Sequence, residues 1–431
     1  MILQLLKKLM NMKLHWQIFL AFAIGITAGL LSGEDASIGG IVRWYDIFDF
    51  LGVLFIRALK MIIVPLIASS IITGVSGIGT SGSLGKIGSK TFLYYIMTSL
   101  LAILVGLFLV NIITPGIEDG VPVKDKLGLT ASTQGFSEDI EEEGVEALVH
   151  IFIRMIPTNP IKSAVDGDIL PIIFFCLLFG YMITKLPSKY NVVLNDFWEA
   201  VFQVMMGMTN LIMRFAPIGV FGLIARIVAS TGFDAFVPLM RYFMTVLGAL
   251  AIHLLITLPL ILKLIGRVKP IRHFKAMLPA LLTAFSTSSS SATLPLTMEC
   301  AEKNAGVSNR VTSFVLPLGA TVNMDGTALY ECVAAMFIAQ AYGINLGFAE
   351  QFVVVITALL ASIGAAGIPS AGLVMITIVL KAIGLPLEGV GLILAVDRVL
   401  DMTRTLVNVF SDSCGTIVIA RSEGEKDLLV D

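Results

Sequence analysis

The last hydrophobic stretch of the chain carries polar side chains at helical spacing. They are Asp397, Asp401, Arg404, Asn408 and Asp412. At about 100° per residue, these positions fall within an arc of roughly 80° on one helix face. A charged side chain at the centre of a bilayer costs at least about 2.5 to 3.5 kcal/mol, so this face must meet protein, water or ligand. Arg404 can neutralise only one carboxylate, and Arg398 at best a second. The remaining negative charge predicts bound cations, and the alternative is an internal salt-bridge ladder.

Side chains on this face could also hold the two ends of an amino acid. The planar guanidinium of Arg404 suits bidentate binding of a carboxylate. Asp401, about one turn earlier, could receive an ammonium group. Backbone amides of a Ser-rich segment at 283–295 and a Gly-Pro segment at 361–372 could bind a further carboxylate. The pattern therefore predicts an α-amino acid or an acidic amino acid as ligand.

A second polar motif, Asn-Met-Asp-Gly-Thr at 323–327, interrupts another hydrophobic stretch. It predicts a helix break that frees backbone carbonyls beside a carboxylate and an amide, and hard cations prefer such oxygen ligands. Asn408 and Asp412 offer the same chemistry, and Gly319 is expected to leave its carbonyl open. The alternative is that the asparagine and the aspartate only cap the break.

Two weaker signals accompany these motifs. Tyr95, Thr98 and Ser99 form one hydroxylated helix face, although such hydroxyls in membrane helices usually bond to their own backbone. Glu331 lies one turn beyond Thr327. A buried carboxyl without a partner tends to keep its proton, which would suit a proton carrier. The alternative for Glu331 is an ion pair with Arg or Lys at the helix end.

The composition is that of an integral membrane protein. The chain has 431 residues, of which 56% are hydrophobic and 14% charged, with a mean hydropathy of +0.91. Soluble domains carry about 25% charged residues. A net charge of −2 argues against nucleic-acid binding. The cysteines and histidines are scattered and suggest neither disulfides nor a zinc site. Neither a nucleotide-binding loop nor a catalytic triad is recognisable, so we expect ion-driven transport rather than an enzyme.

Six hydrophobic runs long enough to span a membrane precede residue 265. They cover 14–32, 47–74, 91–115, 148–185 with a break at Pro157 and Pro160, 192–228 and 237–264. Lys and Arg favour every second connection, which predicts a cytoplasmic N-terminus and an external acidic segment at 116–146.

After residue 275, Ser, Gly, Pro and Asn interrupt the hydrophobic runs. Non-helical backbone at membrane depth is tolerated only where it lines a cavity or is buried in protein. The interrupted segments at 283–295 and 361–372 predict paired re-entrant hairpins around a transport site. The C-terminal half is therefore expected to carry the function, and the N-terminal half to be scaffold.

At these residues the chain resembles the dicarboxylate/amino acid:cation symporter family. The resemblance covers essentially the whole chain and is densest in S-S-S-S-A-T-L-P, N-M-D-G-T-A-L-Y-E, A-A-G-I-P-S-A-G and D-M-T-R-T-L-V-N-V, with P-T-N-P at 157–160. It implies an all-α polytopic fold of eight transmembrane helices and two re-entrant helical hairpins, assembled as a homotrimer. It also implies a scaffold domain and a transport domain that moves as an elevator. The scaffold maps onto 1–85 (helices 1 and 2) and 147–230 (helices 4 and 5), and the transport domain onto 86–146 (helix 3 and the external loop) and 231–431.

The resemblance also implies residue roles. The substrate's main-chain carboxylate maps onto Ser289, Ser290 and Asn408, its side-chain carboxylate onto Arg404, Thr327 and the tip with Gly367, Ile368 and Gly372, and its amino group onto Asp401 and Thr405. Sodium sites map onto Gly319, Asn323, Asn408 and Asp412; onto Thr321, Met324, Ser362 and Ile363; and onto Tyr95, Thr98, Ser99, Asn323 and Asp325.

The chain departs from the family pattern at two arginine positions. In the family pattern, archaeal members have an arginine at the position of Ser288, and mammalian members have one at the position of Met402. This chain has neither arginine. Arg398, one turn earlier, is a candidate for pairing with Asp401, and the alternative is an arginine that faces lipid or an interface. Glu331 matches the mammalian pattern, in which the residue at this position is linked to proton coupling. The archaeal pattern has Gln at this position.

The sequence therefore predicts a Na+-dependent glutamate/aspartate symporter of the plasma (inner) membrane, with both termini cytoplasmic. Neutral amino-acid relatives lack the equivalent of Arg404, and C4-dicarboxylate relatives lack that of Asp401. Proton coupling through Glu331 is left open. The alternatives are a C4-dicarboxylate or purely proton-coupled symporter, and an anion channel or non-transporting receptor on the same fold. Asp397 has no assigned role.

Overall fold

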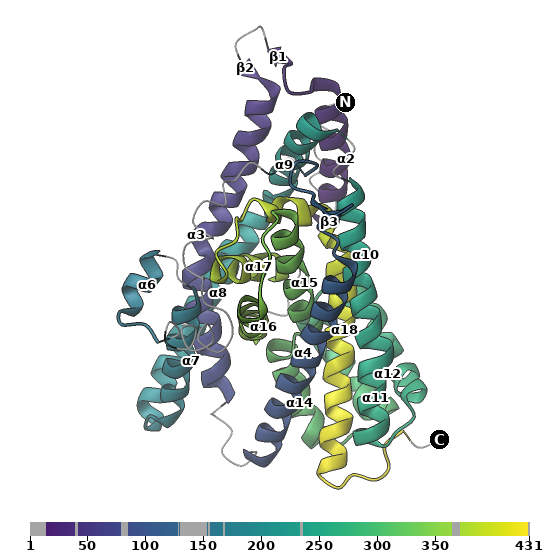
Figure 1. The fold of residues 1–431 in the computed structure, drawn as a ribbon. Coiled ribbons are helices and arrows are strands. Elements are labelled where there is room, and N and C mark those ends of the chain that lie inside the picture. The colour runs from purple at the N-terminus through teal and green to yellow at the C-terminus, as the bar shows by residue number, and fades with distance from the viewer. Residues whose placement is uncertain are drawn as a thin grey trace, which may run out of the picture.

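The computed structural model is mostly helical (Figure 1). It describes residues 14–38, 42–78, 85–127, 129, 153, 156–166, 169–232, 236–363 and 371–429. Predicted features at 130–150 and at 364–370, which include most of the acidic segment together with Gly367 and Ile368, lie outside the described residues.

The N-terminal half forms mostly long helices, together with the seven-residue α6. They are α2 (Leu14–Ser32), α3 (Trp44–Ile78), α4 (Gly85–Ile113), α6 (Pro160–Asp166), α7 (Ile169–Lys185), α8 (Ser188–Arg214) and α9 (Ala216–Thr231). Predicted and observed bounds agree for the run at 14–32. Residues 157–159, directly before α6, are non-helical, in agreement with the predicted break at Pro157 and Pro160.

The C-terminal half consists of shorter, interrupted helices followed by one long helix. In order they are α10 (Phe236–Ile252), η1 (His253–Thr257), α11 (Leu258–Ile261), η2 (Leu262–Gly266), α12 (Pro270–Thr287), α13 (Ser290–Glu299), η3 (Cys300–Asn304), α14 (Asn309–Val322), α15 (Asp325–Ala341), α16 (Phe348–Ile363), α17 (Ala371–Ala382) and α18 (Gly389–Ser422). The segments η1, η2 and η3 are π-helical turns, which often mark functional sites.

Two short β-hairpins connect helices. In the first, β1 (Ser37–Ile38) pairs antiparallel with β2 (Val42–Arg43), so that Ser37 lies opposite Arg43. In the second, β3 (Ile117–Glu118) pairs with β4 (Val121–Pro122), and Glu118 lies opposite Val121. Asp119 and Gly120 form the second turn with φ of 51° and 79°. Positive φ at both central residues is typical of a tight hairpin turn.

One predicted span is wrong as a single element. The run at 192–228 is divided between α8 and α9, and their axes differ by 52° at the break. Among the described residues, Ile87–Ile113 and Phe236–Gly266 are each long and apolar enough to cross a membrane, and the bent pair would make a third span. Large apolar side chains such as Phe108 on α4, 67% exposed, face outward from these helices. Such surfaces require a membrane or a partner rather than water.

The helices pack as a peripheral group and a central group. In the peripheral group, α3 packs against α7, α8 and α9, and α2 packs against α9. In the central group, α15 lies between α4 and α18, and α12 and α14 also pack on α18 (Figure 1). Every residue of α15 is buried. Polar residues on α15 and α18 therefore meet other protein groups rather than lipid.

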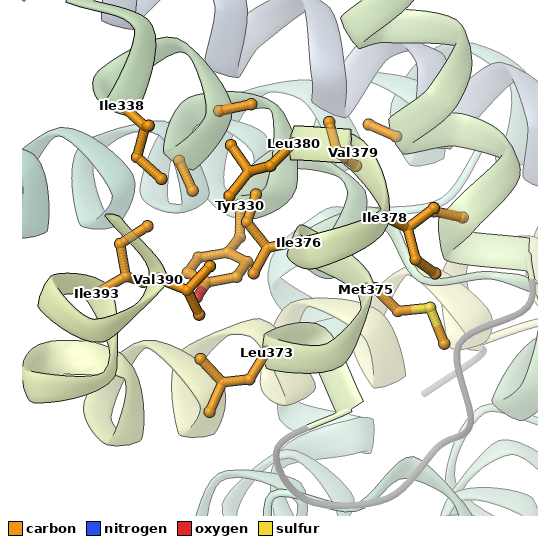
Figure 2. Close-up of a cluster of buried hydrophobic side chains, with 14 of the residues drawn as sticks. Tyr330, Ile338, Leu373, Met375, Ile376, Ile378, Val379, Leu380, Val390 and Ile393 are labelled. Carbon is orange, nitrogen blue, oxygen red and sulfur yellow. The ribbon is translucent and has the colours of Figure 1, made fainter. Parts of the chain in front are cut away.

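A buried apolar cluster joins α15, α17 and α18. Ile338 comes from α15, Ile376 and Leu380 from α17, and Ile393 from α18, and each is at most 1% exposed. Figure 2 shows the ring of Tyr330 among these side chains. The cluster holds α17 against the helices that carry the polar residues.

Two of the predicted interruptions occur at the polar motifs, and the third, at 361–372, falls largely outside the described residues. The chain reverses between α12 and α13 at Ser288, whose φ of 52° is left-handed. We call α12 and α13 the first hairpin and α16 and α17 the second. Between α14 and α15, only Asn323 and Met324 are non-helical. The break predicted at 323–327 is therefore confirmed.

Candidate substrate and ion site

Asp325 is the centre of a buried polar cluster that three helices build. Ser99 of α4 donates a hydrogen bond to Asp325 Oδ1 at 2.6 Å. Ser411 of α18 donates to Oδ2, also at 2.6 Å. His253 Nε2 lies 3.1 Å from the same Oδ2. Asp325 and His253 are both fully buried, so the carboxylate is fixed by three neutral or weakly basic groups.

His253 was not predicted as a site residue. It is the first residue of η1, the π-helical turn that follows α10. The available signal was an ionisable side chain inside an otherwise apolar run. The sequence separation of 72 residues from Asp325 hid the contact. Ser411 was missed as well, although it lies beside the predicted Asp412.

A second carboxylate, that of Asp412, joins the cluster through Asn323. The amide of Asn323 donates to Asp412 Oδ1 at 2.9 Å and to Ser411 Oγ at 3.1 Å. Within the described ranges, Asp412 forms no ion pair with a cationic side chain. Asp325 and Asp412 therefore bring two carboxyl groups into one cluster, whose one basic contact among the described residues is the His253 imidazole, and oxygen-rich sites of this kind suit hard cations.

Gly319 lies where a side chain cannot fit. A Cβ added there would lie 2.5 Å from Asp412 Oδ1 and 2.6 Å from Tyr95 Oη. The carbonyl of Gly319 accepts a hydrogen bond from the backbone N–H of Asn323 at 2.9 Å. The expectation of an open carbonyl was thus wrong, because the end of α14 uses it as a cap; a carbonyl oxygen still has a second lone pair.

The hydroxylated face of α4 lies beside this cluster. Tyr95 donates to Val315 O at 2.7 Å, and Thr98 lies 3.4 Å from Asn323 Oδ1 while also bonding to its own helix. Together with Ser99, these side chains are at most 3% exposed. The structure therefore brings Thr98 to Asn323 and Ser99 to Asp325, and it places Tyr95 beside Gly319.

Other predicted ion ligands lie less centrally. Met324 Sδ accepts a hydrogen bond from the amide of Asn408 at 3.3 Å. Thr321 is exposed, and its hydroxyl bonds to Leu318 O in its own helix at 3.0 Å. Ser362 is buried and bonds to Leu359 O at 2.8 Å. Ile363 is 7% exposed. The hydroxyls of Thr321 and Ser362 donate to their own helices, and their oxygen lone pairs and the backbone carbonyls of all three residues remain as potential ligands.

Asn408 connects the ion cluster to the rest of the polar face. Its Oδ1 accepts the amide of Gly326 at 2.8 Å. Its Nδ2 lies 3.3 Å from Thr327 Oγ1. Asn408 thus holds the start of α15 against α18 at the break between α14 and α15. One side chain touches both the predicted substrate residue Thr327 and the predicted ion ligand Met324.

Arg404 is 1% exposed and bridges two carboxylates. Its Nη2 lies 2.8 Å from Asp401 Oδ1, and its Nη1 lies 3.2 Å from Asp397 Oδ1. Arg404 thus contacts two carboxylates, because its fork spans positions three and seven residues earlier, but its single positive charge can neutralise only one of them, as the sequence predicted. Arg398 Nη1 lies 3.5 Å from Asp401 Oδ2, which confirms the predicted pairing.

The guanidinium of Arg404 is held from two further sides. Its Cζ lies 3.8 Å from the ring centroid of Tyr330, a cation–π contact. A Cβ added at Gly372 would lie 2.7 Å from Arg404 Nη1, so the backbone of α17 closes over the group. Gly372 is the part of the predicted second tip that the structure describes, and it does reach Arg404.

The remaining predicted substrate residues are placed less directly. Ser289 caps α13 by accepting the amide of Ala292 at 3.1 Å, and Ser290 begins that helix. Both serines are buried, and α13 packs against α18. The hydroxyl of Thr405 bonds to Asp401 O at 2.8 Å and so turns back into its own helix. These residues lie on the elements that surround Arg404.

Glu331 is fully buried one turn after Thr327 on α15. Within the part of the chain that the structure describes, neither of its carboxyl oxygens has a hydrogen-bond partner. The predicted alternative, an ion pair at the helix end, is not seen among these residues. A carboxyl in this setting is stable in its protonated, uncharged form.

A helical membrane protein in which buried carboxylates, amides and one guanidinium converge between interrupted helices has the form of a secondary transporter. Comparison with known proteins agrees. The sodium:dicarboxylate symporter family matches residues 14–422, and the chain belongs to this family. Its members are symporters and not enzymes.

Individual relatives carry more specific names. The chain is 40% identical to excitatory amino acid transporter 3 of Homo sapiens, over 93% of this chain and 84% of that protein. It is 34% identical to the proton/sodium-glutamate symport protein of Geobacillus stearothermophilus, over 96% of this chain and 95% of that protein. It is also 34% identical to the proton/glutamate-aspartate symporter of Escherichia coli (strain K12), over 97% of this chain and 95% of that protein.

Proposed function

We propose that this protein is a membrane symporter that takes up glutamate or aspartate with sodium ions. The observation that carries the proposal is the buried Asp401–Arg404 pair beside a carboxylate-rich cluster. Arg404 offers a fork for a carboxylate, and Asp401 offers an acceptor for an ammonium group. An acidic amino acid carries both groups. The names of the relatives, which refer to glutamate and aspartate, support the same substrate class.

The substrate would bind between the first hairpin, the second hairpin and α18. In this proposal Ser289, Ser290 and Asn408 receive the main-chain carboxylate, while Arg404, Thr327 and the tip near Gly372 receive the side-chain carboxylate. The amino group would displace Arg404 or Arg398 from Asp401. Because Arg404 already bridges Asp397 and Asp401, substrate binding would exchange one carboxylate partner of Arg404 for another. The guanidinium would not be left without a carboxylate partner.

Sodium would be carried as co-substrate at the cluster built around Asp325 and Asp412. Asn323 and the face formed by Tyr95, Thr98 and Ser99 would supply further oxygen ligands. Asn408 would couple the two sites, because it contacts both Thr327 and Met324. A ligand that orders this side chain from one side lowers the cost of binding on the other.

Proton co-transport through Glu331 is the second part of the proposal. A fully buried carboxyl whose oxygens have no hydrogen-bond partner among the described residues is suited to carry a proton. The names of two relatives refer to protons as well as to glutamate. We expect Glu331 to be protonated when substrate and sodium are bound.

The larger architecture is also proposed. We infer eight transmembrane helices and two re-entrant hairpins, with 1–85 and 147–230 as scaffold and 86–146 and 231–431 as the moving transport domain. Exposed apolar side chains on the peripheral helices, such as Val165 at 82% and Val193 at 63%, support a lipid or subunit interface there. A homotrimer, an elevator motion and cytoplasmic termini in the plasma membrane complete the proposal.

Substrate competition separates this proposal from a C4-dicarboxylate transporter of the same fold. Purified protein in liposomes would take up labelled aspartate, with unlabelled aspartate and succinate as competitors. The proposal predicts strong competition by aspartate and weak competition by succinate, since only aspartate has an ammonium group for Asp401. Equal competition by aspartate and succinate would favour a C4-dicarboxylate transporter.

A further inference from the structure

The chain folds back on itself after α18 ends at Ser422. The turn is made at Gly424, whose φ is +96°, and the amide of Glu425 bonds to Ala420 O at 3.1 Å. The following residues run along one end of the molecule, where Figure 1 places the C-terminus near α11 and α12. We call residues 423–429 the C-terminal strap. They have no part in the substrate and ion site.

Glu425 of the strap binds the first residues of α14. Its Oε1 accepts a hydrogen bond from Ser308 Oγ at 2.5 Å, and its Oε2 accepts the amide of Ser308 at 3.1 Å. Ser308 is the N-cap residue of α14, and its own side chain does not cap the helix. A carboxylate at a helix N-terminus is favourable because it meets free amides and the positive end of the helix dipole.

The end of the strap is buried against the base of the first hairpin. Leu428 and Leu429 are 5% and 8% exposed. The amide of Leu429 donates to Ala305 O at 3.0 Å, and Arg272 at the start of α12 donates to Leu429 O at 3.3 Å. A Cβ added at Gly306 would lie 2.9 Å from Asp427 O. The strap therefore contacts the start of α12 and the residues that follow η3, which together form the base of the first hairpin.

The start of the strap is attached to two other elements. Lys90 of α4 donates to Glu423 Oε1 at 2.7 Å and to Ser422 O at 3.2 Å. Arg421 donates to Gly266 O at 3.2 Å and to Glu425 O at 3.0 Å. The strap and the last two residues of α18, 421–429, thus connect α4, the end of η2, α12, the turn before α14 and α18.

We propose that the C-terminal strap clamps the base of the first hairpin to α4, α14 and α18, so that the hairpin moves with these helices and does not open by itself. The clamp acts through Glu425 on Ser308 and through Leu429 on Ala305 and Arg272. With the base fixed, the position of the tip at Ser289 and Ser290 is set by α18. This last step rests on the proposed function, whereas the clamp itself does not.

The strap contains a matched pair of acidic residues for a test. Glu425 binds Ser308, whereas the exposed Asp427 has no side-chain contact among the described residues. The variants Glu425→Gln and Asp427→Asn each remove one carboxylate charge. Hydrogen exchange followed by mass spectrometry on the full-length chain in nanodiscs would report amide exchange at 300–310.

The clamp predicts roughly tenfold faster exchange at 300–310 in Glu425→Gln, which is the effect expected from losing a helix cap. Asp427→Asn should match the parent protein. Gly306→Ala, whose added methyl pushes on Asp427 O, should release the same amides and provides a second route if Glu425→Gln does not fold. Unchanged exchange in both Glu425→Gln and Gly306→Ala would overturn the clamp.

A transport measurement tests the consequence for the tip. If the base sets the position of Ser289 and Ser290, Glu425→Gln should raise the KM for aspartate about threefold, while Asp427→Asn should leave it unchanged. Faster exchange with an unchanged KM would overturn the link between base and tip. Because exchange is measured without substrate, failure of the proposed function would leave the result on the clamp intact.

Discussion

Arg404 Nη2 lies 2.8 Å from Asp401 Oδ1, one helical turn away on α18. The two groups that we assign to opposite ends of the substrate therefore hold each other. Asp397 on the other side of the guanidinium keeps Arg404 compensated when Asp401 changes partner. In the proposed function, a substrate with both charges replaces this internal pair with two external ones, and we expect selectivity for acidic amino acids over simple dicarboxylates.

Replacing Asp401 tests this exchange of partners. Asp401→Asn keeps the shape of the side chain but removes its negative charge and leaves only a neutral carbonyl oxygen to accept an ammonium group. We expect aspartate to bind roughly 100-fold more weakly, since breaking a buried charge pair costs about 3 to 5 kcal/mol and Arg398 and Asp397 offset part of the loss. Succinate should lose much less. Competition assays measure both, and an equal loss for both ligands would contradict the assignment.

His253 should set the affinity for sodium. Its Nε2 lies 3.1 Å from Asp325 Oδ2, so it orients a carboxylate that we assign to an ion site. Removing a group that orients a metal ligand typically weakens metal binding 10- to 100-fold. We expect His253→Phe to raise the sodium concentration for half-maximal uptake about tenfold or more. His253→Gln, which can still donate a hydrogen bond, should recover part of the affinity; equal defects in both variants would argue against orientation.

Gly319→Ala should disturb the same cluster by size alone. The added Cβ would lie 2.5 Å from Asp412 Oδ1 and 2.6 Å from Tyr95 Oη. We expect a several-fold weaker response to sodium because the carboxylate must move. Gly207→Ala on α8 is the control, since a Cβ there meets no atom within 4 Å. A response to sodium that is the same in the two variants would remove Gly319 and Asp412 from the ion site.

Glu331→Gln tests proton coupling. Gln keeps the size of the side chain and cannot release a proton. If Glu331 carries a proton with the substrate, uptake by the parent protein should rise when the substrate side is made more acidic than the opposite side. The variant should lose this response while it still exchanges substrate. Unchanged pH dependence in Glu331→Gln would show that the proton, if transported, uses another group.

Local patterns predicted the helix break and the arginine pairing well. Asn323 and Gly326 have low helix propensity, so a break between α14 and α15 is favoured by the local sequence. The Arg398–Asp401 contact follows from a spacing of three residues on one helix. Both depend only on residues close together in the chain.

Contacts between distant segments could not be predicted in this way. His253 meets Asp325 across 72 residues because η1, which packs against α4 and α18, brings the imidazole to the first residue of α15. The bend between α8 and α9 was missed because hydropathy is the same on a straight and on a bent apolar helix. The Gly319 carbonyl is capped because α14 runs to the break itself. The first two depend on tertiary packing, whereas the capped Gly319 carbonyl depends on the exact residue at which α14 ends.

Uptake under imposed gradients tests the central claim most directly. Purified protein in liposomes would be given labelled aspartate with a sodium gradient, a potassium gradient or a pH gradient, each imposed alone. We predict concentrative uptake that depends on an inward sodium gradient and collapses when the sodium gradient is removed. Uptake that is indifferent to the sodium gradient would contradict the account.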